Sequence, residues 1–220
     1  MARSDREFLD RIRSATAAAR RFFSHEGADE RERTMVAGFL TVLGIDYSAD
    51  DIIKAGPEPI DVHFRDAKFQ TTEILDDDRK RDKEIRERGG RAARAQRAGD
   101  LLEPVNLTGS AISAGELVER VRSCADAKRL HYAGQVARID LLVYVNLRGR
   151  FVRDDTSFHA FSETEAGGWR SISVVMEGFA IVLWAAHDAP AFLCAVIGKP
   201  MFRRTLESNF PDLSATPERR

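Results

Sequence analysis

The chain has 220 residues, with 34 Lys and Arg against 35 Asp and Glu, so its net charge is −1. Hydrophobic residues make up 43% and charged residues 31%, which is typical of globular proteins and excludes collagen-like, low-complexity and disordered classes. The balanced charge also excludes a wholly basic, histone-like protein. A chain of this length buries about 70% of the surface that it exposes when unfolded, so its core needs no metal or disulfide.

The sequence predicts a cytoplasmic protein with no membrane contact. Its longest apolar stretches, around residues 180–186 and 191–198, fall well short of the roughly 20 residues of a membrane-spanning helix. The first residues are charged and lack the apolar core of a signal peptide. The two cysteines, Cys124 and Cys194, lie far apart and favour buried, reduced thiols over a disulfide.

The first part of the chain predicts two helices and a hairpin. Apolar residues recur at three- and four-residue spacing over 4–23 and again over 29–43, which is typical of amphipathic helices. The segment 48–59 contains Gly56, Pro57 and Pro59 and predicts a loop. Residues 60–64 and 68–75 alternate between polar and apolar and are separated by three residues, so we expect antiparallel neighbours.

The second part of the chain alternates helical and strand patterns. We expect a charged surface helix over 77–98, either unbroken or broken at Gly89-Gly90, and a second helix that begins at Ser113. A strand buried on both faces is expected at 139–147, and a hairpin from 170–175 and 180–185. Residues 191–197 predict a strand or a short helix.

This order of elements predicts an α/β (or α+β) fold with a mixed sheet flanked by helices. We expect a single domain over 1–207, followed by a flexible tail at 208–220. Its parts are the N-terminal helices 4–43, the hairpin 60–75, the helices 77–130 and the strands 139–197.

The most informative segment is Pro-Glu-Pro-Ile-Asp-Val-His-Phe at 57–64, followed by Phe-Gln-Thr-Thr-Glu-Ile at 69–74. Gln70 and Thr72 share one face of the predicted strand because strand side chains alternate, and Asp61 can lie beside them across the hairpin. Polar groups inside a sheet cost free energy unless they are paired, so this grouping indicates a candidate site.

This segment resembles the PD-(D/E)XK nuclease superfamily, which has a restriction-endonuclease-like core with an Asp at one strand start and an acid-x-Lys on the adjacent strand. It is most similar to a small bacterial group of uncharacterised proteins described as “putative endonucleases”, with E-P-x-D-V-x-F leading into F-Q-x-x-E-I. The motif covers residues 57–76, and the helix–hairpin–helix–strand order extends the similarity over 29–147.

The resemblance implies roles for three residues. Asp61 corresponds to the first metal-binding Asp, Gln70 to the second acid and Thr72 to the Lys, so two of the three positions depart from the pattern. The neutral carbonyl of Gln70 would hold Mg²⁺ more weakly than a carboxylate does. Thr72 lacks the ammonium that would stabilise charge on the reacting phosphate.

Neighbouring residues offer replacements. Glu73 can turn into the site at a bulge, Lys68 shares the face of Gln70, and Glu30 or Glu32 can supply a carboxylate from the preceding helix. Structural interpretations stay open for each candidate: Asp61 accepting backbone N–H bonds after a loop, Gln70 and Thr72 pairing across the sheet, Glu32 capping a helix after Asp29, and Glu73 pairing with Arg79 or Arg81.

Residues 79–98 carry nine basic and three acidic side chains, a local net charge of +6. Such a segment either contacts phosphates or forms a solvated helix face. Because it directly follows the candidate strand, we predict nucleic-acid contacts from its basic residues, among them Arg79, Lys80, Arg81, Lys83, Arg86, Arg91 and Arg94.

The sequence therefore supports three functional hypotheses. The first is a Mg²⁺- or Mn²⁺-dependent endonuclease acting on DNA rather than RNA, with catalytic Asp61, Gln70, Glu73, Lys68 and Thr72 and the metal ligands Asp61, Gln70, Glu73 and Glu32. The second is an inactive nuclease-fold protein that binds nucleic acid or a protein partner. The third is a structural protein that forms a homodimer through its apolar strands at 170–197.

Overall fold

The structure is a computed structural model that describes residues 3–56, 58–101 and 109–203. The described residues form two compact units, one from 3–31 and 78–101 and the other from 32–77 and 109–203. The single domain expected over 1–207 stays a prediction beside this division, and the tail at 208–220 lies outside the described residues.

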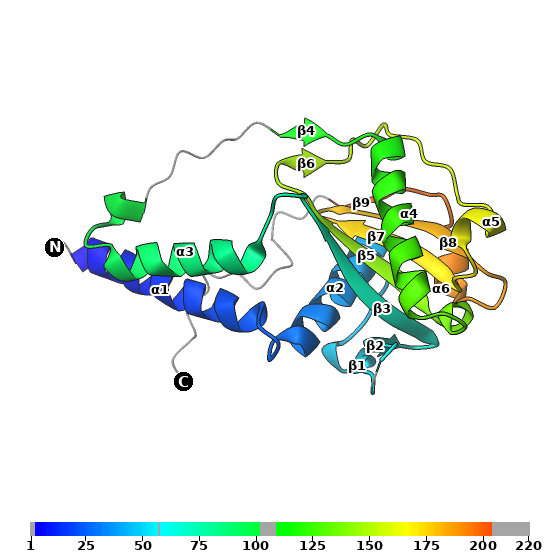
Figure 1. Cartoon of the computed structure of the whole chain (residues 1–220), viewed down its shortest axis with the longest axis horizontal. Coiled ribbons are helices and arrows are strands. Elements are labelled where there is room, and N and C mark those ends of the chain that lie inside the picture. The colour runs from blue at the N-terminus through cyan, green and yellow to red at the C-terminus, as the bar shows by residue number, and fades with distance from the viewer. Residues whose placement is uncertain (1–2, 57, 102–108, 204–220) are drawn as a thin grey trace. The chain divides into compact units, whose positions relative to one another are not determined.

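The first unit pairs helix α1 (Arg3–Phe22) with helix α3 (Arg81–Arg94), and the 3₁₀ helix η2 (Ala98–Leu101) follows α3 (Figure 1). Arg13 of α1 donates from Nε to the carbonyl of Ala92 at 3.0 Å and from Nη2 to that of Ala95 at 3.1 Å. These bonds satisfy carbonyls near the C-terminal end of α3 and place positive charge at the negative end of its dipole.

Helix α3 runs unbroken through Gly89 and Gly90. A Cβ atom on Gly89 would lie 3.3 Å from Cγ2 of Thr16, so the missing side chain lets α1 and α3 approach closely. At the other end of the pair, the guanidinium of Arg81 lies 4.3 Å from the ring centroid of Phe23, at cation–π distance. Alanine, glycine and arginine contacts therefore hold this unit together.

The second unit is built on a mixed sheet of seven strands in the order β1-β2-β3-β5-β7-β8-β9. The strands are β1 (Ile52–Lys54), β2 (Val62–Phe64), β3 (Ala67–Leu75), β5 (Asp140–Asn146), β7 (Ser171–Met176), β8 (Phe179–Ala185) and β9 (Met201–Phe202). Strand β5 is parallel to both β3 and β7, and the other neighbours are antiparallel. Strands β4 (Ser110–Ala111) and β6 (Arg150–Phe151) form a separate parallel pair.

The two longer helices of this unit cover opposite faces of the sheet (Figure 1). Phe39 of α2 (Ala28–Leu43) packs edge-on against Phe69 of β3, with 6.0 Å between ring centroids. Cys124 of α4 (Ala114–His131) lies 3.9 Å from Oγ1 of Thr72, on the other face of the same strand. The shorter helices are η1 (Ala49–Asp51), η3 (Val136–Arg138), α5 (Glu163–Ala166) and α6 (Ala191–Cys194).

The α/β class and the mixed sheet flanked by helices are confirmed. Strand β5 is buried at every position except its last, as the apolar run at 139–147 predicts. The predicted hairpin at 60–75 is present as β2 and β3, and that at 170–185 as β7 and β8. Both cysteines are free thiols, and Cys194 lies in the short helix α6 that was one of the two expectations for 191–197.

One expectation from the sequence was wrong. Ile52–Lys54, inside the segment predicted as a loop, forms β1 because Ile52 is buried and pairs with Phe64 of β2. The apolar strands β7 and β8 lie inside the sheet, since β7 lies between β5 and β8 and β8 also pairs with β9. Their apolar character is therefore explained by burial within this chain, and the homodimer stays a prediction.

A buried ion pair lies where β5 and β7 begin. The carboxylate of Asp140 is fully buried and accepts hydrogen bonds from Nε of Arg170 at 3.0 Å, from Nη2 of Arg170, from Oγ of Ser171 at 2.8 Å and from the main-chain N–H of Lys68 at 2.8 Å. Arg170 also donates to the carbonyl of Asp66 at 3.0 Å. One charge pair thus joins the β2–β3 hairpin to β5 and β7.

Removing only one partner of this ion pair is expected to destabilise the fold strongly. Asp140→Ala leaves the guanidinium of Arg170 buried without its counter-charge, which we expect to lower the free energy of unfolding by about 3–5 kcal/mol. Urea denaturation measures the loss. The double variant Asp140→Leu/Arg170→Met removes both charges and should be less destabilised than Asp140→Ala, and the reverse order would contradict a buried, mutually compensating pair.

Candidate functional site

Asp61 lies directly before β2 and opposite Gln70 of β3. Its main-chain N–H donates to the carbonyl of Phe69 at 2.8 Å, which continues the ladder between the two strands. Its Oδ2 accepts three hydrogen bonds, from Nε2 of Gln70 at 3.0 Å, from the main-chain N–H of Thr71 at 2.7 Å and from Oγ1 of Thr71 at 3.0 Å. The hairpin thus brings Asp61 and Gln70 together, as the alternation along the strands indicates.

The surroundings of Asp61 act on its charge in opposite directions. Burial is the largest influence and raises the pKa of Asp61, and the nearby carboxylate of Glu32 raises it further. The hydrogen bonds from Thr71 and the ammonium of Lys54 lower this pKa, but the net direction is upward. Asp61 is therefore a carboxylate whose charged form is only partly compensated by the protein.

Glu32 and Lys54 form an ion pair beside Asp61. Nζ of Lys54 on β1 donates to Oε2 of Glu32 on α2 at 2.9 Å. The side chain of Glu32 is 17% exposed and that of Lys54 is 38% exposed, so the pair borders solvent. Asp61, Glu32 and Lys54 carry two negative charges and one positive charge, which leaves a net negative site.

Gln70 adds a neutral oxygen to this group. It is 4% exposed, and its Nε2 is committed to Asp61. Its buried Oε1 accepts no hydrogen bond from the residues that the structure describes, which is costly for a buried carbonyl and leaves this oxygen able to bind a cation or a ligand donor. Tyr132 directly follows α4. Burial raises the pKa of its phenol, and the nearby carboxylates of Glu58 and Asp61 raise this pKa further.

The other predicted site residues are placed elsewhere. Glu73 accepts a hydrogen bond from Nδ2 of Asn146 at 3.0 Å, and it is three residues, or about 10 Å, further along the strand than Gln70. Thr72 meets Cys124 of α4. Lys68 shares the Gln70 face of β3. Among residues 3–56, 58–101 and 109–203, no group of three or more His, Cys, Asp and Glu is arranged to hold a metal.

The structure differs from the sequence-based expectation in three respects. Glu32 does not cap α2, because that helix begins at Ala28, and its carboxylate is bound by Lys54 instead. Lys54 was missed because its segment was interpreted as a loop. The buried Asp140 was also missed, although a single Asp inside the apolar run at 139–147 is a visible signal of a paired charge.

The predicted nucleic-acid-binding residues lie in the first unit and Asp61 lies in the second. Arg79 pairs with Glu84 at 3.1 Å, and Arg81 lies on the ring of Phe23. Lys83 is 3.8 Å from Glu87, and both side chains are mostly exposed. Lys80, Arg86, Arg91 and Arg94 are exposed. Arg79 and Arg81 thus contribute to packing within their unit.

Fold and site together define an α/β protein with a carboxylate–lysine–amide cluster at one end of a mixed sheet. The chain belongs to the family described as “Putative endonuclease, protein of unknown function (DUF1780)”, whose model matches residues 4–208. No curated protein matches it. A solved structure of a protein of unknown function from Pseudomonas aeruginosa strain PAO1, described as Monooxygenase Superfamily, is similar, with a TM-score of 0.62 and 27% identity over 93% of this chain and 97% of that one.

None of the helices in the described part of the chain is long and apolar enough to cross a membrane.

The charge of Asp61 is expected to destabilise the fold. Because the pKa of Asp61 is raised above 3.8, the folded protein binds this proton more tightly than the unfolded chain does, so stability is lost as pH rises through the interval between 3.8 and the raised value. We expect Asp61→Asn to have a higher free energy of unfolding than the wild type at neutral pH. Urea denaturation should show this difference vanish below pH 3.8, and a less stable variant at neutral pH would contradict it.

Proposed function

We propose that this protein is a metal-dependent endonuclease that hydrolyses DNA phosphodiester bonds at a site formed by Asp61, Glu32, Gln70 and Lys54. The observation that carries the proposal is the setting of Asp61. Its carboxylate is fixed by three hydrogen bonds at one oxygen, and a second carboxylate, Glu32, lies near enough to raise its pKa. Two carboxylates in a partly buried site repel each other, and a divalent cation relieves that repulsion.

The available oxygens fit Mg²⁺ or Mn²⁺. Mg²⁺ is commonly held by one or two carboxylates together with water and substrate phosphates, and Asp61 and Glu32 supply two carboxylates. The carbonyl Oε1 of Gln70 is buried and accepts no hydrogen bond from the described residues, so it can serve as a neutral ligand. Binding of the cation would weaken the ion pair between Glu32 and Lys54, because the carboxylate of Glu32 would then bind the cation.

The chemistry follows from these groups. A bound divalent cation would polarise the scissile phosphate and lower the pKa of a water molecule. Asp61 and Glu32 would hold the cation, and the ammonium of Lys54 would stabilise the negative charge that develops on the phosphate oxygens. The water would release one proton to solvent, and its oxygen would form a bond to phosphorus while the bond to the leaving sugar oxygen breaks. The sugar oxygen would then take up a proton from solvent.

The family description favours this hydrolytic chemistry. The Pseudomonas structure is described with a different class, monooxygenases, and that description concerns that protein. Carboxylates that can hold a cation, together with a nearby lysine, are the groups that metal-assisted phosphate hydrolysis uses. The sequence contains no G-x-G-x-x-G motif, which would indicate a dinucleotide cofactor. An inactive nuclease-fold protein is the second candidate, because Gln70 and Thr72 depart from the superfamily pattern.

Removing either carboxylate should abolish cleavage. We expect Asp61→Ala and Glu32→Gln each to lower the rate of Mg²⁺- or Mn²⁺-dependent DNA cleavage by about 100-fold or more, since each removes a cation ligand. Gel assays on supercoiled, linear and single-stranded DNA measure this. Asp66→Asn, an exposed carboxylate in the turn of the same hairpin, is the matched control and should cleave normally.

Three outcomes decide the proposal. A wild-type protein that cleaves no form of DNA with either cation would leave the inactive nuclease fold as the better description. Cleavage that survives Asp61→Ala would place the chemistry elsewhere. If Glu73→Gln lowers cation affinity in calorimetry and Glu32→Gln does not, Glu73 rather than Glu32 completes the shell.

Lys54 is expected to act on the phosphate rather than on the cation. Lys54→Met should lower kcat by about 10-fold or more with little change in KM, and Lys54→Arg should retain part of the rate because it keeps the charge. Cation affinity, measured by calorimetry, should stay the same or rise in Lys54→Met, since Glu32 loses a competing positive charge. If Lys68→Met loses the rate and Lys54→Met does not, the other lysine has this role.

A further inference from the structure

Charge is divided unevenly between the two units. The segments 3–31 and 78–101 carry 16 Lys and Arg against 11 Asp and Glu, a net charge of +5, so the rest of the chain carries −6. The first unit buries few large apolar side chains, among them Leu9 and Phe22, and its α3 is held through alanines, glycines and arginines. The first unit is therefore the positively charged one of the two.

Four basic residues of α3 fall on one side of the helix. At about 100° per residue, Lys83, Arg86, Arg91 and Arg94 lie within an arc of about 140°, and we call them the α3 basic row. All four are exposed, and Lys83 is 66% exposed. Ala92, which is buried and whose carbonyl receives Arg13, lies on the opposite side of the helix.

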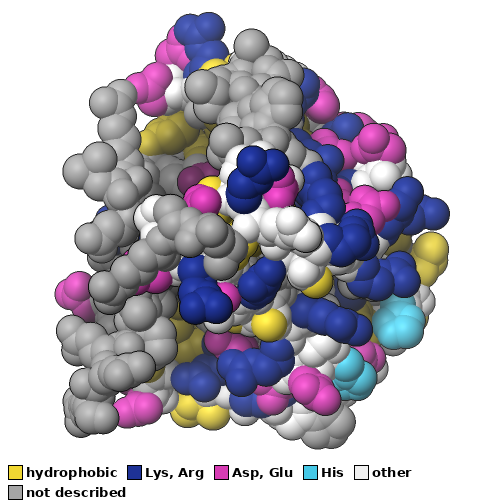
Figure 2. Space-filling model, turned by 90° about the vertical axis from the view of Figure 1, so that its left-hand side faces the viewer, with side chains coloured by type: hydrophobic (Ala, Val, Ile, Leu, Met, Phe, Trp, Pro, Cys, Tyr) yellow, Lys and Arg dark blue, Asp and Glu magenta, His cyan; other side chains and the backbone are white. Residues whose placement is uncertain are grey.

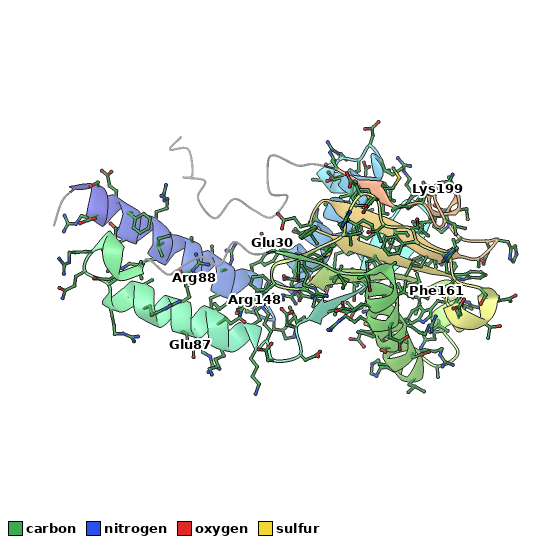
Figure 3. All side chains as sticks on the ribbon, turned by 90° about the horizontal axis from the view of Figure 1, so that it is seen from above. Glu30, Glu87, Arg88, Arg148, Phe161 and Lys199 are labelled. Atoms are coloured by element: carbon green, nitrogen blue, oxygen red, sulfur yellow. The ribbon has the colours of Figure 1, made fainter. Side chains whose placement is uncertain are left out.

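The row has the spacing of a phosphate-binding surface. From Lys83 to Arg94 the helix rises by about 16 Å, the length of about five base-pair steps of DNA. Glu87, labelled in Figure 3, lies one helical turn after Lys83, and the ion pair between them is long, at 3.8 Å, and exposed to solvent. In Figure 2, Lys and Arg side chains lie among Asp and Glu side chains on the side that faces the viewer.

We infer that the α3 basic row binds the phosphate backbone of double-stranded DNA, without base specificity and without need of a divalent cation. This inference deepens the proposed function, because it assigns substrate binding to one unit and cleavage to the other. The partner is chosen by charge: a run of closely spaced phosphates is the polyanion that several arginines along one helix can contact together. Arg79 and Arg81, which pack within the unit, are not part of this surface.

The test separates binding from cleavage. Full-length protein carrying Asp61→Ala is kept in EDTA, and its affinity for a fluorescein-labelled DNA duplex is measured by anisotropy across a salt series. Adding Lys83→Gln, Arg86→Gln and Arg94→Gln should weaken binding about 10-fold or more near 0.1 M salt and reduce the log–log salt slope by about 2.7, since each phosphate contact contributes about 0.9.

The matched control removes three charges from exposed positions of the second unit. Arg138→Gln, Arg153→Gln and Lys199→Gln should leave the affinity and the salt slope within about twofold of the parent. The exchange Lys83→Arg/Arg86→Lys/Arg94→Lys keeps the charge and should bind normally, which separates loss of charge from loss of folding. Circular dichroism checks that every variant keeps its helices.

Binding and activity can fail separately. If the wild type does not cleave DNA but the α3 basic row binds it, the inference stands and the proposed nuclease falls. Equal loss in both triple variants would assign binding to net charge rather than to this row and overturn the inference. Absence of salt-sensitive DNA binding, an unchanged slope in the α3 variant, or tighter binding of poly-glutamate than of DNA would overturn it as well.

Discussion

The hairpin that presents Asp61 depends on a charge buried elsewhere in the sheet. Asp140 is the first residue of β5 and is fully buried. Its carboxylate accepts hydrogen bonds from the main-chain N–H of Lys68, at the start of β3, and from the guanidinium of Arg170. Arg170 in turn holds the carbonyl of Asp66 in the hairpin turn. These bonds fix the start of β3. They therefore also fix the positions from which Gln70 and Thr71 donate hydrogen bonds to Asp61, so the candidate site is supported by the core of the sheet.

The near-neutral net charge of the chain is an average over two unlike units. The helical pair has an excess of positive charge, and the sheet unit has an excess of negative charge that includes both carboxylates of the candidate site. If the whole protein were negatively charged it would repel a polyanion, and if it were positively charged throughout it would bind a polyanion at many places away from the candidate site. Separate signs allow one unit to attract phosphates while the other retains the carboxylates that a divalent cation requires.

The sheet was largely predictable because its sequence signals are strong and local. A nearly continuous apolar run with valines and an isoleucine favours an interior strand, as at 139–147. Alternation over 60–75 predicts a hairpin whose register sets Asp61 against Gln70. The missed features are those that depend on tertiary contacts. Ile52–Lys54 is too short to show a period, and it becomes a strand only because β2 offers Ile52 a buried partner. The pairing of Glu32 with Lys54 joins residues far apart in the chain, which no spacing rule identifies.

In the proposed nuclease site, Lys54 supplies the positive charge that the resemblance assigns to position 72. A lysine at position 72 would meet Cys124 and the covering helix α4, whereas Lys54 reaches the carboxylates from β1 at the solvent border. Gln70 in place of an acid removes one negative charge from a position that is nearly fully buried, where a third carboxylate beside Asp61 and Glu32 would raise the pKa of its neighbours further. The amide still anchors Asp61 through Nε2 and leaves a carbonyl oxygen for a ligand. In the proposed site, Gln70 and Thr72 therefore add no further buried charge, and the neighbouring residues supply the oxygens and the positive charge that the proposed hydrolysis uses.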